Sequence, residues 1–148
     1  MRTNDTARRA DGELIDALAQ SAFLTMGVLT RLAADNDLSL TQLRVLAILR
    51  DRDLQMGDLA SYLGLEKSTL TGLVSRAEKR GLVQRRASGT DRRGVDVRLS
   101  DQGQALAARL TGDLESLLAP LTDALDPAER DDLRRLLAKA TGAAAPSR

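Results

Sequence analysis

The chain of 148 residues contains no cysteine and no histidine. The missing cysteines exclude disulfides and thiol redox chemistry, and without either residue the usual zinc sites cannot form. Histidine is also the commonest general base of enzymes, so most nucleophile–base catalysis is excluded as well. We therefore expect a protein that is not an enzyme and that uses no cofactor and no metal.

Aromatic residues and long apolar runs are also scarce. Phe23 and Tyr62 are the two aromatic residues, so the core must be built from leucine, valine, isoleucine and alanine. We find no apolar run that approaches the roughly 18 residues of a membrane span. The segment 1–11 is polar and does not resemble a signal peptide. These features predict a cytoplasmic protein without membrane contact, with one domain or two small ones that share a core.

Positive charge is concentrated in one part of the chain. Residues 65–98 contain nine Lys or Arg and four Asp or Glu, which gives this segment a net charge of +5 in a chain of net charge +1. The remaining residues therefore carry −4. A basic segment within an acidic body indicates an anionic partner for that segment.

Apolar periodicity and end signals predict helices in the first half of the chain. Apolar residues recur at helical spacing over 12–34, and Ser39 with Gln42 forms a capping box that opens a helix ending near residue 50. Residues 54–56 are a short extended candidate. Helices over 57–63 and 66–80 are separated by Gly64, which predicts a helix-turn-helix.

A hairpin and two further helices complete the pattern. Strands are predicted over 82–87 and 95–99, Ser100 can cap a long helix that Pro120 disturbs late, and Asp126 opens a last helix. The predicted fold is mainly α with a small β-hairpin wing, in which long terminal helices form a dimerisation domain. Its parts are a flexible tail (1–11), a dimerisation helix (12–36), a winged helix-turn-helix lobe (39–100, with the helix-turn-helix at about 57–80 and the wing at 82–99), dimerisation helices (101–141) and a second tail (142–148).

The helix predicted over 66–80 has one apolar side, and its opposite side combines short hydroxyl residues, a glycine and cations. Small side chains allow close approach to another surface, while Arg and Lys suit phosphates or guanine edges. An ordinary solvated face is the alternative, but such a face is usually rich in Glu and Lys. We predict DNA recognition by Lys67, Ser68, Thr69, Thr71, Gly72, Ser75, Arg76 and Lys79.

The stretch RASGTDRRGVDVRLS predicts a two-stranded ribbon with arginines at its tip. The narrow, electronegative minor groove of A·T-rich DNA attracts arginine, and a neighbouring carboxylate can hold a guanidinium extended. A polar turn with a chance basic cluster is the alternative. The predicted wing residues are Arg86, Asp91, Arg92 and Arg93.

The run EKSTLTGLVSRAEKRGLVQRRASGTDRRGVDVRLSDQG resembles the MarR family of bacterial transcription regulators. The motifs on which the resemblance rests are a basic pair before Gly-Leu-Val, Asp-Arg-Arg at the wing tip, and Leu99-Ser100 followed by Gly103. The upstream LSLTQLRVLAIL is similar to the second helix of the family, so the resemblance covers residues 12–141. Two residues depart from the family pattern. Glu66 stands where the family often has a helix-capping residue, and Ala77 stands where it often has leucine.

The resemblance implies a homodimer in which the first and the last two helices interdigitate. Wide apolar faces on these helices agree with it, although periodicity fits an intramolecular helical core equally well. The predicted interface residues are Leu14, Leu18, Leu110, Leu114, Leu133, Leu136 and Leu137.

Members of the family often sense small aromatic or phenolic compounds in a cleft beside the DNA-binding lobe. Phe23, Met26 and Tyr62 are the candidates for such a cleft, and plain packing roles for Phe23 and Tyr62 are the alternative. Sensing through cysteine or histidine is excluded because both residues are absent.

The pattern as a whole predicts a homodimeric, sequence-specific transcription regulator. We expect a ligand-responsive repressor that binds an inverted-repeat operator in double-stranded DNA. The alternative is a winged-helix interaction module that presents the same basic face to an acidic protein.

Overall fold

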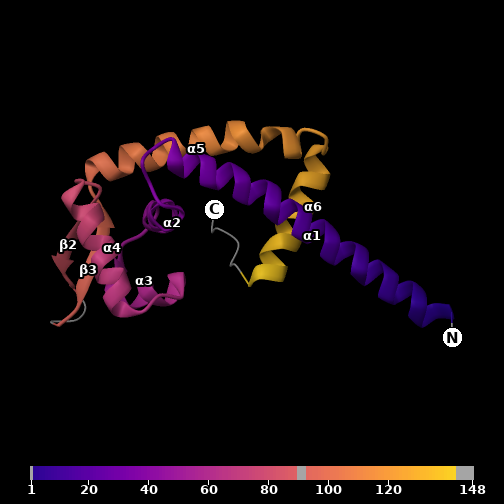
Figure 1. Cartoon of the computed structure of the whole chain (residues 1–148), viewed down its shortest axis with the longest axis horizontal. Coiled ribbons are helices and arrows are strands. Elements are labelled where there is room, and N and C mark those ends of the chain that lie inside the picture. The colour runs from indigo at the N-terminus through magenta and orange to yellow at the C-terminus, as the bar shows by residue number, and fades with distance from the viewer. Residues whose placement is uncertain (1, 90–92, 143–148) are drawn as a thin grey trace. The chain divides into compact units, whose positions relative to one another are not determined.

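A computed structural model describes residues 2–89 and 93–142, with side chains from Asp11 onward. The chain divides into two compact units, Met1–Leu114 and Glu115–Arg148. The predicted mainly α fold with a small β wing is confirmed. The elements are α1 (Arg2–Ala34), α2 (Leu40–Leu49), β1 (Leu54–Gln55), α3 (Met56–Leu63), α4 (Lys67–Lys79), β2 (Val83–Ala87), β3 (Val95–Leu99), α5 (Asp101–Thr122) and α6 (Pro127–Thr141) (Figure 1).

Local end signals fix the boundaries of several helices. The hydroxyl of Ser39 accepts a hydrogen bond from the backbone N–H of Gln42, whose side chain accepts one from the N–H of Ser39, so the predicted capping box is present. Gly64 ends α3 with a φ of 63°, a left-handed conformation that glycine adopts without the penalty of a Cβ. These contacts explain why α2 and α3 begin and end within a residue or two of the prediction.

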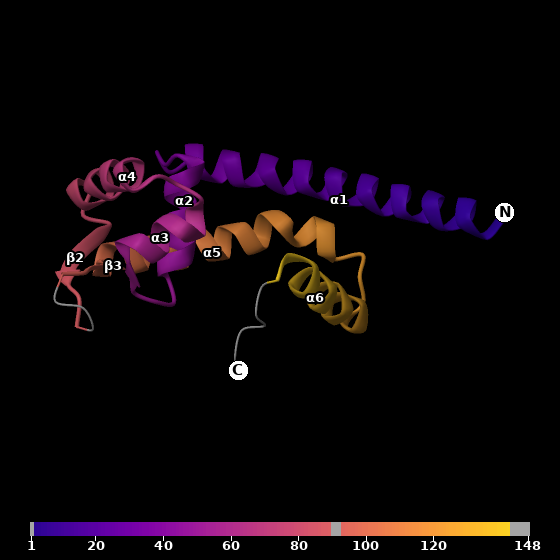
Figure 2. The ribbon, with the colours of Figure 1, turned by 90° about the horizontal axis from the view of Figure 1, so that it is seen from below.

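The wing belongs to a three-stranded antiparallel sheet with the order β1-β3-β2. In its register Leu54 lies opposite Val97, and Arg85 lies opposite the same residue from the other side. The strand β1 leads directly into α3, and β2 follows α4 after a short turn. Figure 2 shows α4, β2 and β3 at one end of the first unit. The sheet thereby joins the helix-turn-helix and the wing into one lobe.

The core of the lobe is aliphatic, as the scarcity of aromatic residues predicts. It is formed by α2, α3, α4, the sheet and the ends of α1 and α5 that adjoin them. Each fully buried leucine or valine contributes roughly 1.5–3 kcal/mol through the burial of its side chain. The largest of these side chains are Leu49, Leu59, Leu70, Val45, Val74, Val83 and Val97.

The start of α5 passes very close to the start of β2. Ser100 donates a hydrogen bond from its hydroxyl to the carbonyl oxygen of Gly81 and accepts one from the N–H of Gly103. A Cβ added to Gly103 would lie 2.0 Å from the carbonyl oxygen of Leu82. Glycine is therefore required at this crossing, which ties the base of the wing to α5.

The second unit contains the end of α5 and the whole of α6. Asp126 accepts hydrogen bonds from the N–H groups of Ala128 and Glu129, and the Glu129 side chain accepts one from the N–H of Asp126. Pro127 stands at the first position, as expected. No residue of α6 is buried within the described chain. Its leucines therefore remain available to a partner.

The structure corrects two expectations about the first helix. Helix α1 begins at Arg2, whereas a flexible tail was expected over 1–11; the three arginines and two alanines there have high helix propensity. We also expected no apolar run near 18 residues, but an 18-residue window within Asp11–Ala34 has a mean hydropathy of 1.2, so this portion could cross a membrane by length and composition alone. One such helix is weak evidence for a span, because the core helix of a soluble protein and a signal sequence near the N-terminus pass the same test.

The late disturbance expected at Pro120 is small. Helix α5 continues through Pro120 and ends two residues later at Thr122. The carbonyl oxygen of Ala119 accepts a hydrogen bond from the Thr122 hydroxyl and another from the N–H of Asp123. Proline therefore precedes the end of the helix without breaking it.

Candidate nucleic-acid interface

Helix α4 has one buried side and one exposed side, as its sequence predicts. Its core side consists of Leu70, Leu73, Val74 and Ala77. The predicted recognition residues lie on the other side, where Gly72 and Ser75 are half-buried. The exposed ones are Lys67, Ser68, Thr69, Thr71, Arg76 and Lys79.

The first turn of α4 carries no side-chain cap. Glu66 occupies the cap position and makes no capping hydrogen bond, which agrees with its departure from the family pattern. The first N–H groups of the helix therefore have no capping side chain within the described part of the chain. Free N–H groups at a helix start attract anions such as phosphate.

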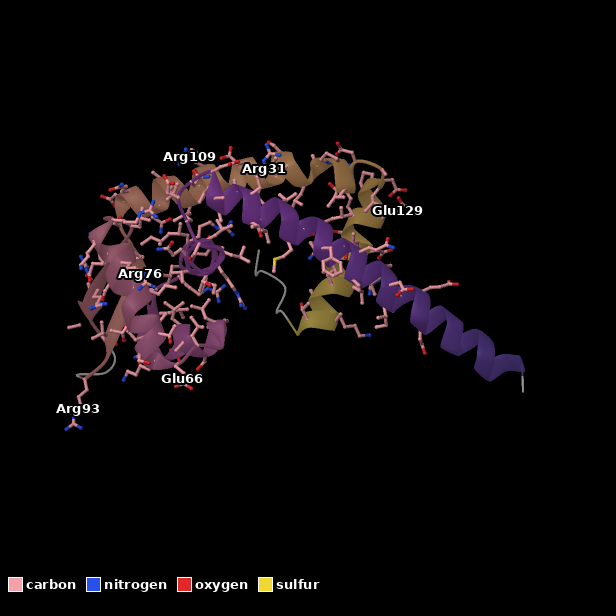
Figure 3. All side chains as sticks on the ribbon, in the orientation of Figure 1. Arg31, Glu66, Arg76, Arg93, Arg109 and Glu129 are labelled. Atoms are coloured by element: carbon pink, nitrogen blue, oxygen red, sulfur yellow. The ribbon has the colours of Figure 1, made fainter. Side chains whose placement is uncertain are left out.

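The wing extends beyond the lobe, and two of its predicted DNA-facing arginines, Arg86 and Arg93, are exposed. Arg93 lies at the tip and points away from the rest of the unit (Figure 3). Arg86 is exposed in β2 and lies opposite Asp96 of β3. Asp91 and Arg92 lie outside the described residues, so the orienting role of Asp91 stays a prediction.

Arg85 connects the wing to the recognition helix, and sequence reasoning missed it. Its guanidinium donates to the hydroxyl of Ser75 at 2.6 Å and to the carbonyl oxygen of Thr71 at 3.3 Å. The Glu78 carboxylate lies 3.7 Å from its Nε. Three attachments to one helix fix the position of β2 against α4.

This bridge changes the interpretation of Ser75. The sequence places Ser75 among residues that face DNA, but its hydroxyl accepts a hydrogen bond from Arg85 and it is half-buried. Ser75 therefore supports the geometry of the surface. The alternation of β2 could have indicated Arg85, because it shares a face of the strand with Val83.

An apolar cavity of about 510 Å³ lies within the first unit, between α1, α2 and α5. Met26 lines it, as predicted, whereas Phe23 and Tyr62 are absent from its lining. Phe23 is 80% exposed, and Tyr62 is 52% exposed beside Arg52. The lining is mostly leucine, with the polar residues Thr41, Arg44, Arg50 and Thr111.

The two arginines of the cavity differ in their charge compensation. Arg50 forms an ion pair with Asp51 at 2.8 Å, and its hydrogen bonds hold the pKa of that carboxyl below its ordinary value. Arg44 instead donates to the neutral carbonyl oxygen of Tyr62 at 3.1 Å. Within the described residues Arg44 has no acidic partner, so it leaves positive charge beside an apolar cavity.

The predicted interface leucines divide into two groups. Leu110 is only 4% exposed and belongs to the core of its own chain, so its assignment to an interface is corrected. Leu114 packs against that core but is only partly buried, and its interface role stays a prediction. Helical periodicity cannot distinguish an intramolecular contact from an intermolecular one. The others are exposed: Leu14 and Leu18 in the first unit, and Leu133, Leu136 and Leu137 in the second.

The helix pair α3–α4 and the sheet whose strands precede and follow it define a winged helix-turn-helix protein. A family model described as the MarR family matches residues 36–94, which contain this lobe. Over this lobe the chain is similar to the MarR family, and the curated relatives that it matches are named as transcriptional regulators.

Individual relatives agree with this assignment. The transcriptional regulator YfiV of Bacillus subtilis is 38% identical over 47% of this chain and 44% of its own length. The transcriptional repressor MprA of Escherichia coli is 28% identical over 60% of this chain and 51% of its own length. The matches thus span about half of these two relatives.

Solved structures are similar over most of the chain. MarR from E. coli in its apo form has a TM-score of 0.68 and 27% identity, over 87% of this chain and 94% of MarR. A mutant MarR complexed with operator DNA has a TM-score of 0.64 and 27% identity, over 87% of this chain and 91% of its own.

Proposed function

We propose that the chain acts in the cytoplasm as a homodimeric, ligand-responsive transcriptional repressor that binds an inverted-repeat operator. One observation carries this proposal: the exposed hydroxyl and basic side of α4 is held to an arginine-bearing wing through Arg85. A helix and a ribbon fixed together can enter a major groove and the adjacent minor groove at the same time. The complex of MarR with operator DNA supports this use of the fold.

Dimerisation follows from the leucines that each unit leaves exposed. Leu14, Ile15 and Leu18 are exposed on α1, and three leucines of α6 are exposed in the second unit. Burying such apolar surface against a second copy contributes about 25 cal/mol per Å². Two lobes held about 34 Å apart would enter successive major grooves, which requires an inverted repeat with half-sites about 10 base pairs apart.

The apolar cavity suits a small-molecule effector. Its lining is mostly aliphatic, and Arg44, which has no acidic partner in the described part of the chain, places a positive charge at its edge. An apolar molecule with one acidic or strongly polar group would match both features. Repression is the direction of regulation that the name of MprA supports.

A mobility-shift titration tests DNA binding directly. The promoter region beside the gene of this chain would be compared with a shuffled sequence of equal length and composition. Binding should be sequence-dependent and should weaken steeply as salt rises, because Lys and Arg release counterions from the phosphates. Equal affinity for both sequences, or no shift at low salt, would favour the interaction module with an acidic protein partner.

We expect two exposed cations of α4 to contribute in different ways. Arg76→Ala should relax the preference at a defined base position, at a cost of about 1–3 kcal/mol, if the guanidinium reads a base edge. Lys79→Ala should weaken binding to all sequences about equally and reduce the salt slope by about one unit, as for a phosphate contact. The measurement is a titration of both variants against a set of operator variants. If neither variant altered binding, the DNA surface would have to lie elsewhere.

Arg85→Ala should weaken operator binding about tenfold without changing the salt slope. The reason is that Arg85 holds β2 against α4 through charge-assisted hydrogen bonds, each worth about 1.5–3 kcal/mol, and does not itself neutralise a phosphate. Arg85→Lys should restore little of the lost operator affinity, because the ammonium group of lysine lacks the forked N–H donors of a guanidinium.

Arg98→Ala is the matched control, because Arg98 of the neighbouring strand donates to Gln84 within the wing. Titrations at several salt concentrations separate the outcomes. A fall of the salt slope by one unit in Arg85→Ala would identify a direct phosphate contact instead.

A further inference from the structure

A second hollow of the first unit has no role in the proposed DNA surface or in the apolar cavity. Its volume is about 580 Å³, and it lies where the α1–α2 turn, the end of α4 and the first turns of α5 meet. Arg80, the second residue of the basic pair in the sequence motif, is the C-cap of α4. The lining residues include Asn36, Arg80, Leu82, Gln102, Leu106 and Arg109.

Two guanidinium groups converge on Asn36 in this hollow. Arg109 donates to its side-chain oxygen at 3.1 Å, and Arg80 donates to its carbonyl oxygen at 3.5 Å and to that of Asp37 at 2.6 Å. The amide nitrogen of Asn36 donates to the carbonyl oxygen of Leu32 at 2.8 Å, which fixes the side chain. All acceptors of the two arginines are neutral, so the arginines are held in place while their charges remain uncompensated.

The hollow differs in this respect from the ion-paired arginine sites of the chain. No acidic residue lines it, and neither Arg80 nor Arg109 forms an ion pair across residues 2–89 and 93–142. Arg31 of α1, by contrast, pairs with Asp35. Each guanidinium has five N–H donors, and one or two are used here. Spare donors and two like charges in one hollow favour the binding of an anion.

We propose that this hollow binds a small, free oxyanion of the phosphate type. A tetrahedral, multiply charged anion can accept hydrogen bonds from both guanidinium groups at once. Figure 3 shows Arg109 at the opposite end of the lobe from Glu66 and Arg93, so the hollow is separate from the wing tip and the start of α4. The bound anion would cross-link the end of the recognition helix to α5.

Calorimetric titration of the full chain with inorganic phosphate and with pyrophosphate tests the proposal, in a buffer free of other multivalent anions. We expect saturable binding in the millimolar range or tighter, and a rise of Tm with anion concentration. Arg109→Gln should weaken binding by about tenfold or more, because one charge-assisted hydrogen-bond partner is lost. Arg31→Gln removes the same charge from an exposed ion pair and should leave binding unchanged.

Three results would overturn the proposal. The first is the absence of saturable binding, and the second is an equal loss in Arg109→Gln and Arg31→Gln, which would reflect net charge alone. The third result is a reduction of the salt slope of DNA binding by about one unit in Arg109→Gln, which would make the hollow part of the DNA surface.

Circular dichroism of each variant verifies that the lobe remains folded. Arg109→Lys keeps the positive charge and provides a second test, in which partial binding is expected.

Discussion

Gly103→Ala is expected to lower the stability of the protein by about 3 kcal/mol or more, because a forced overlap in a packed region is costly. The added Cβ would lie 2.0 Å from the carbonyl oxygen of Leu82 and 3.0 Å from its carbonyl carbon. Backbone atoms cannot turn away as the end of a flexible side chain can, so β2 or α5 must shift. For a chain of this size the Tm should fall by roughly 10 °C, measured by thermal denaturation followed by circular dichroism.

Gly112→Ala is the matched control on the same helix. Apart from the adjoining backbone of α5, no atom of the described residues lies within 4 Å of the position that its Cβ would take, so the substitution replaces glycine by the best helix former without a clash. It should raise the free energy of unfolding by up to about 1 kcal/mol or leave it unchanged, so Tm should not fall. A stable Gly103→Ala variant would show that α5 and β2 do not cross as closely as described here.

Leu136→Asp is expected to convert the protein to monomers and to abolish specific operator binding. Leu136 is 52% exposed in a helix without buried residues, so its substitution leaves the core of a single chain intact. In a dimer interface the new carboxylate would lose its hydration at a cost on the order of 3 kcal/mol, more than about a hundredfold in the dimer dissociation constant. Sedimentation velocity at micromolar concentration measures the change.

Arg135→Glu places an acid on the opposite side of α6 and should leave the dimer intact. Leu110→Asp is unsuitable for this test, because Leu110 is buried in the core and its substitution would unfold the lobe. An unmodified protein that sediments as a monomer and still binds an operator specifically would disprove the dimer.

The sequence predicts most element boundaries because their signals are local. Ser39 and Asp126 cap their helices through residues three positions away, and Gly64 ends α3 by its own backbone conformation. The face of α4 was also predictable, since its apolar residues repeat at helical spacing and its remaining positions must face outward.

Other features depend on contacts that no local pattern specifies. Leu110 and Leu136 both belong to apolar helical stripes, yet one is buried in its own chain and the other is exposed. The alternation of β2 places Arg85 on the face of Val83, but the contact of that face with α4 depends on how the sheet packs against the helix. The exposure of Phe23 likewise follows from where α1 leaves the lobe.

The short strand β1 has a mechanical consequence. It pairs with β3 on one side of the wing, and Arg85 ties β2 to α4 on the other. Because β1 continues without a gap into α3, neither the ribbon nor the helix pair can tilt independently while these bonds persist. We therefore expect each lobe to move as a rigid body, so that an effector would have to regulate affinity through the distance between two lobes.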